Sequence, residues 1–215
     1  HLFSSAASDV YKRQAVAGGV TSVFDMPNNK PSITTKILFQ TKLKRAKGRL
    51  YSNYAFYFGA ENNNIKEINK VEKLDGCCGV KVFVGSSTGT LLVSNHEDIK
   101  KIMKSTKKMI SFHSEDEDEL IKRERFRKKN KPQTHYIWRD VNTALKSTRK
   151  LIVNANKTKK KIHILHITSA EEVNILKKNK KYVSFEVTPQ HLVFSAPSAY
   201  KKLGTYAQMN PPIRD

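Results

Sequence analysis

The sequence predicts an α/β protein that forms part of a parallel (β/α)8 barrel of the TIM type. The first observation is that short runs of β-branched and aromatic residues alternate with helical stretches, an arrangement typical of parallel strands joined by right-handed crossovers. The second is that polar residues stand at or near the C-terminal ends of the expected strands, where such barrels build active sites. These residues are Asp25, Lys81, Ser114, Glu115, His166 and Thr188.

Six segments have the length and composition of strands. They span residues 21–27, 50–60, 79–85, 109–115, 161–168 and 182–189. Helices are expected between them, among others at residues 32–49 and 139–157. Thr168 and Ser169, followed by Glu171 and Glu172, are typical of a helix N-cap with acids in the first turn. Six such units suit part of a barrel better than a complete sheet. A doubly wound sheet is the alternative, although residues 15–22 lack the glycine spacing of a nucleotide-binding loop.

Composition sets broad limits on the protein class. The chain has 215 residues, enough for one substantial core or two small ones, and no apolar run is long enough to cross a membrane. Its first residues lack the pattern of a secretory signal. The two cysteines, Cys77 and Cys78, are adjacent and predict no disulfide framework, so a cytoplasmic location is expected.

The formal charge of +21 suits either a nucleic-acid partner or a small anionic substrate. The lysines are scattered along the helical stretches, and no zinc-finger, RNP or helix-turn-helix pattern accompanies them. Specific nucleic-acid binding is therefore the less favoured interpretation.

Three residues on successive strands carry the candidate chemistry. Lys81 interrupts an apolar strand, and His113 and His166 stand at the ends of the next two strands. Imidazoles are good ligands for zinc. A buried ammonium is costly, whereas a lysine carbamate is an anion able to bridge two metal ions. The simpler alternatives are a lysine that reaches the surface or pairs with an acid, and histidines that are hydrogen-bonded structural residues.

Seven motifs in order give these positions a family context. They are "GGVTSVFDMPNNKPS", "GVKVFVGSSTGTLLV", "SFHSEDE", "HYIWRDVNTAL", "KIHILHITSAEEV", "FEVTPQHLVFS" and "YAQMNPPIRD". From about Ala15 to Asp215 the chain resembles dihydroorotase, in the cyclic amidohydrolase branch of the metal-dependent amidohydrolases. Dihydropyrimidinase and allantoinase share the layout, but "KVFVGSSTG" with "MNPPIRD" resembles dihydroorotase more closely.

The resemblance implies a site with two zinc ions. Lys81 matches the carboxylated lysine that bridges them, and His113 and His166 match metal-binding histidines of the fifth and sixth barrel strands. Asn28 and Asn210 match substrate-binding asparagines. The resemblance gives His163 a packing or supporting role and His135 and Arg139 structural support, and it assigns His191 no ligand role.

The resemblance also implies residues that this chain does not show. The family carries a His-x-His pair and an arginine on its first strand, and an aspartate on its eighth strand that binds metal and acts as general base. The interpretation is an internal fragment of approximately strands two to seven at residues 15–215, with the general base expected beyond the C-terminus. Residues 1–14 do not resemble the family and are interpreted as foreign or disordered. With three ligands of six, the fragment itself is expected to bind metal weakly and to show no turnover.

The expected function of the intact protein is zinc-dependent hydrolysis of a cyclic amide. The resemblance implies the interconversion of N-carbamoyl-L-aspartate and L-dihydroorotate in pyrimidine biosynthesis. The expected partner is a small anionic cyclic amide, with no specific nucleic acid, no membrane and a possible homo-oligomer. The alternatives are a hydrolase of dihydropyrimidines, hydantoins or allantoin, and an inactive homologue with a structural role.

Overall fold

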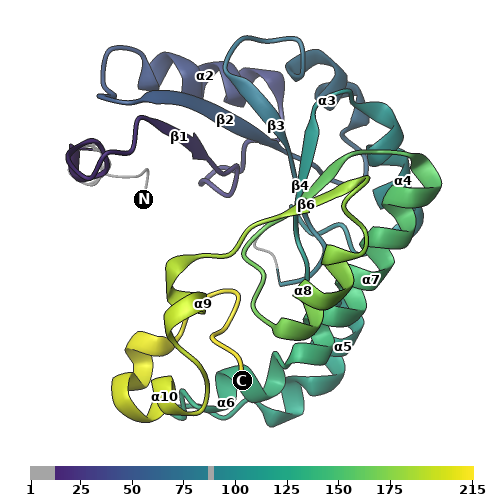
Figure 1. Ribbon diagram of the computed structural model, residues 1–215. Helices are drawn as coiled ribbons and strands as arrows, with labels where there is room; N and C mark the ends of the chain where they lie inside the picture. Colours follow the sequence, from purple (N-terminus) through teal and green to yellow (C-terminus); the bar gives the residue numbers. More distant parts are fainter. Residues whose placement is uncertain (1–12, 87–89) are drawn as a thin grey trace.

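The computed structural model of the chain describes residues 13–86 and 90–215, and in these residues six strands form one parallel sheet (Figure 1). The strands are β1 (Ser22–Asp25), β2 (Asn53–Gly59), β3 (Cys77–Phe83), β4 (Met109–His113), β5 (Ile162–Ile164) and β6 (Val183–Phe185). Each lies within or overlaps one of the six predicted segments. The interpretation of residues 1–14 falls, apart from its last two residues, outside the described residues.

The strands follow one another across the sheet in the order of the sequence. Each neighbouring pair is parallel. A doubly wound sheet would reverse its strand order at a switch point, and this sheet does not. Figure 1 shows the sheet as an open curve with helices along its outer side. The predicted partial TIM-type barrel is confirmed, with β1 and β6 as the edges of the described sheet.

Helices fill the connections. They are α2 (Lys36–Ala46), α3 (Ile65–Val71), α4 (His96–Ser105), α5 (Glu117–Arg123), α6 (Thr134–Trp138), α7 (Val141–Thr158), α8 (Ala170–Lys177), α9 (Pro189–Val193) and α10 (Ser198–Leu203), with 3-10 turns η1 (Glu124–Phe126) and η2 (Gly204–Ala207). Helices α2, α3, α4, α7 and α8 contact one another in that order and form the outer layer. Of the described helices, none combines the length and the apolarity needed to span a membrane.

Side-chain alternation gives the sheet two different faces. One row pairs Val82 with Phe112 and Phe112 with Ile164, and these buried residues belong to the main hydrophobic core. The row beside it pairs Lys81 with Ser111, and Ser111 with His163. Because partners in register share a face, polar side chains line the inner, concave side of the curve. That side is where a barrel site would be built.

The predicted N-cap of α8 is present. Ser169 is the N-cap residue, its hydroxyl accepts from the amide of Glu172 and donates to the Glu172 carboxylate at 3.0 Å, and the side chains of both residues are buried.

We expect Ser169→Ala to lower the free energy of unfolding by about 1 kcal/mol, because a first-turn amide loses its partner. Urea denaturation measures the change. Ser198→Ala, at the exposed start of α10, is the matched control, and an equal loss in both variants would contradict the capping role.

Candidate functional site

The C-terminal ends of β3, β4 and β5 bring the three predicted metal-site residues to one rim. Lys81 lies on β3, His113 is the last residue of β4, and Phe83 pairs with His113 in register. His166 follows β5 by two residues, with a left-handed backbone φ of 40°. Lys81 and His113 are 2% and 4% exposed. The structure thus places the three predicted residues at neighbouring strand ends, with Lys81 and His113 buried, and their metal-binding role stays a prediction.

The two imidazoles face each other with their ring nitrogens. Nδ1 of His113 lies 3.1 Å from Nε2 of His166, and the rings are at 71°. Burial lowers the pKa of His113, and burial with the charges of His113 and Lys81 lowers the pKa of His166 to about 2. Both rings are thus neutral at pH 7. Two nitrogens sharing one tetrahedral zinc ion would lie roughly 3.3 Å apart, so this pair fits a common cation.

Lys81 is enclosed, and no carboxylate in the described part of the chain forms an ion pair with it. Its Nζ donates to the carbonyl of Val82 at 2.9 Å and lies 3.6 Å from the centre of the Phe83 ring. Burial lowers the pKa of Lys81 well below its usual value, because desolvation disfavours the ammonium form. Its charge, when present, lowers the pKa of both His113 and His166, which places all three groups in one environment.

The described residues do not complete a metal site by themselves. Among them, no group of three or more histidine, cysteine, aspartate or glutamate side chains is placed to hold a metal ion. The donor set at the rim is two imidazoles and one amine. An amine that becomes a carbamate would add the missing anionic oxygens.

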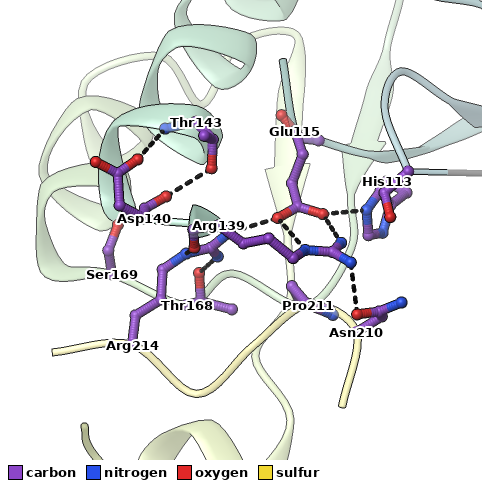
Figure 2. A network of polar contacts seen from close by, with 12 residues as sticks. His113, Glu115, Arg139, Asp140, Thr143, Thr168, Ser169, Asn210, Pro211 and Arg214 are labelled. Atoms are coloured by element: carbon purple, nitrogen blue, oxygen red, sulfur yellow. Dashed lines mark hydrogen bonds and ion pairs between the residues drawn. The ribbon is translucent and has the colours of Figure 1, made fainter. Parts of the chain in front are cut away.

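A buried ion cluster, which we call the Glu115 cluster, adjoins His113 (Figure 2). It consists of Glu115, Arg139 and Arg214. Oε2 of Glu115 accepts from Nε2 of His113 at 2.7 Å, and Oε1 accepts from Arg139 Nε at 3.1 Å and from Arg214 at 2.6 Å. Oε2 is also bonded by Arg139 Nη2. Burial raises the pKa of Glu115, but His113 and the two guanidinium groups outweigh it and hold this pKa well below its ordinary value.

Sequence reasoning placed Glu115 at a strand end but gave it no role. The available signal was its position two residues after a candidate ligand, within "SFHSE". A strand residue and its neighbour two positions on share a face, so the pattern alone suggested contact. Its two arginine partners lie 24 and 99 positions away, which the pattern did not reveal.

The two predicted substrate-binding asparagines differ in position. Asn210 joins the Glu115 cluster, because its Oδ1 accepts from Arg139 Nη1 at 2.6 Å (Figure 2). Asn28 is an exposed residue in the loop after β1, and β2 separates β1 from the strand of Lys81. The structure thus brings Asn210 to the site and leaves Asn28 at the edge of the sheet. The binding roles of both stay predictions.

Other histidines hold the last segment of the chain in place. His135 donates to the carbonyl of Met209 at 2.9 Å, and His191 donates to that of Pro211 at 3.3 Å. His163 contacts Ser184 and Glu186 across β6. These contacts are those of supporting residues.

Two of the polar residues at strand ends face elsewhere. Asp25 ends β1, but its carboxylate forms a 3.0 Å ion pair with Lys42 of α2. Ser114 is hydrogen-bonded to Thr148 of α7 at 2.9 Å. Both therefore contact the outer helices.

The chain is similar to known proteins in both sequence and fold. A dihydroorotase of Pyrococcus abyssi is 34% identical over 205 aligned residues, which cover 94% of this chain and 44% of that protein. An allantoinase of Escherichia coli is 25% identical, with 94% and 48% covered. Among solved structures, the L-hydantoinase (dihydropyrimidinase) of Arthrobacter aurescens superposes with a TM-score of 0.87 at 21% identity, with 95% and 47% covered. No family model matches the chain.

The fold and these matches relate the chain to the cyclic amidohydrolases. Within that class it is related in sequence to the dihydroorotases, and it spans a little under half of the length of the curated relatives that it matches.

Proposed function

We propose that the whole protein is a zinc-dependent dihydroorotase that interconverts N-carbamoyl-L-aspartate and L-dihydroorotate. The observation that carries the proposal is the rim of β3, β4 and β5, where two neutral imidazoles face each other at 3.1 Å beside a buried amine. The substrate in this proposal is inferred from the dihydroorotase relatives. On the same basis we assign the protein to pyrimidine biosynthesis in the cytoplasm.

In this proposal, Lys81 is carboxylated. The neutral amine is the form that reacts with carbon dioxide: its nitrogen forms the new bond to carbon, and one proton passes to water. Burial keeps the amine in this reactive form. The product is an anion, and a buried anion requires a cation beside it. Lys81 carbamate, His113 and His166 would together hold the metal.

In the proposed reaction, the zinc and the protein side chains have different roles. Bound zinc supplies a Lewis acid that polarises the amide carbonyl and lowers the pKa of water. The chain orients the ring. Because Oδ1 of Asn210 accepts from Arg139, the NH2 group of Asn210 is the part presented to a carbonyl of the substrate. The lysine-rich surface attracts anions, and both reactant and product are anions.

A substrate comparison tests the proposal. We expect the zinc-loaded whole protein to open dihydroorotate with a kcat/KM roughly 100-fold or more above that for hydantoin, dihydrouracil or allantoin, because those rings lack the carboxylate. Ring opening is followed by ultraviolet absorbance. Preference for an uncharged ring would replace the proposal with a hydantoinase-like activity, which the structural neighbours keep as the second candidate. Absence of turnover on all four substrates would favour an inactive homologue.

A further inference from the structure

Glu115 occupies a position that the reaction proposed above does not use. The carboxylate is 1% exposed and is bonded by one imidazole and two guanidinium groups. These groups come from β4, from the residue after α6 and from the C-terminal segment. A buried carboxylate with this number of charged donors is held in one orientation.

The contact with His113 determines which ring nitrogen carries the proton. An ionised carboxylate only accepts hydrogen bonds, so Nε2 of His113 must be the protonated nitrogen. Nδ1 is then left with a bare lone pair, and Nδ1 is the atom that faces His166 at 3.1 Å. The same hydrogen bond fixes the rotation of the ring about its Cβ–Cγ bond.

Arg139 extends the arrangement to the other side of the site. Its guanidinium bonds Glu115 through Nε and Nη2 and bonds Asn210 through Nη1. The second guanidinium, that of Arg214, bonds Glu115 and the main-chain carbonyl of Arg139. A displacement of Glu115 would therefore move both His113 and Asn210 (Figure 2).

We propose that Glu115 is a positioning residue that fixes the tautomer and orientation of His113 and, through Arg139, the orientation of Asn210. The link to metal affinity and substrate rests on the proposed function. The tautomer does not, because it is a property of the metal-free chain. The competing explanation is that the Glu115 cluster only fastens the C-terminal segment to the barrel.

Nitrogen-15 NMR of labelled histidine tests the tautomer directly. In the metal-free chain, His113 is expected to show a single tautomer, with the proton on Nε2. In Glu115→Gln, an amide that can donate or accept replaces the carboxylate, so a mixture of tautomers is expected. Glu171→Gln, an exposed glutamate in the first turn of α8, is the matched control and should leave the His113 signals unchanged.

Zinc titration supplies the second readout. Glu115→Gln is expected to weaken zinc binding by about 10- to 100-fold, the usual effect of removing a hydrogen-bond partner from a metal-binding histidine. Glu171→Gln should change nothing. Circular dichroism confirms folding. If Glu115→Gln does not fold, Glu115→Asp keeps the charge beside Arg139 and Arg214 but shortens the reach to His113, and it should still lose the single tautomer.

The outcomes separate the two proposals. A folded Glu115 variant with an unchanged His113 tautomer and unchanged zinc affinity would overturn the positioning role. A changed tautomer in the Glu115 variant, together with no zinc binding by the wild-type whole protein, would support positioning and overturn the metal assignment. A changed tautomer with weakened zinc binding, in a protein that opens no cyclic amide, would support positioning and overturn only the proposed function.

Discussion

Lys81→Met is expected to make the metal-free, carbon-dioxide-free chain more stable at pH 7 while it removes zinc binding. Burial in the folded chain disfavours the ammonium form of Lys81 and lowers its pKa, whereas the unfolded chain exposes the group as a solvated ammonium. Folding therefore requires either the loss of a proton or the desolvation of a charge. Methionine fills a similar volume and requires neither.

The pH dependence of this difference has a definite sign. The folded pKa of Lys81 is lowered below the unfolded value of about 10.4. Between the two values, the unfolded chain binds one more proton than the folded chain, so wild-type stability rises with pH by about 1.4 kcal/mol per unit. Lys81→Met lacks this slope. Its advantage over the wild type should therefore shrink steadily as the pH rises towards 10.

Denaturation at several pH values measures the difference. Lys104→Met, an exposed lysine in the last turn of α4, is the control and should show no such trend. If the difference between wild type and Lys81→Met were constant from pH 6 to pH 10, the buried neutral amine would be wrong. The proposed carbamate would then lose its chemical basis.

The sequence was sufficient to predict the six strands and the rim because both depend on local patterns. Lys81 stands between Val80 and Val82, so strand alternation predicts that it lies on the opposite face from both valines. Its pairing with Ser111 of the next strand is seen only in the folded sheet. The same alternation of faces explains why the side chain of Asp25 lies on the outer side of the sheet, which the sequence did not reveal. It pairs with Phe56, which packs on the outer helices, so its side chain meets Lys42. The short strand β1 carries too little alternation to show this in advance.

The Glu115 cluster was beyond sequence reasoning for another reason. Its members come from a strand end, a helix end and the C-terminal segment, so only the completed fold brings them together. The motif resemblance marked Arg139 and Asn210 separately. It did not indicate that one guanidinium bonds both Asn210 and the glutamate beside His113.

Arg139→Met is expected to be among the most destabilising single changes outside the apolar core, with a loss of about 3–5 kcal/mol in the free energy of unfolding. The side chain is 2% exposed, and removing its charge leaves Glu115 as a buried carboxylate with Arg214 and His113 as its remaining partners. Arg149→Met, an exposed arginine of α7, is the matched control and should cost less than about 0.5 kcal/mol.

The size of this loss should depend on the charge of Glu115. In the wild type, the folded pKa of Glu115 is lowered, so its contribution to stability is present above the unfolded pKa of about 4.3 and is lost as the pH falls through the folded pKa. Without Arg139 the folded pKa rises. The gap between wild type and Arg139→Met should therefore narrow below pH 4. Adding Glu115→Gln to Arg139→Met should likewise cost less than the sum of the two single changes, because the uncompensated charge is gone. Additive losses and a gap independent of pH would show that Arg139 acts by packing alone.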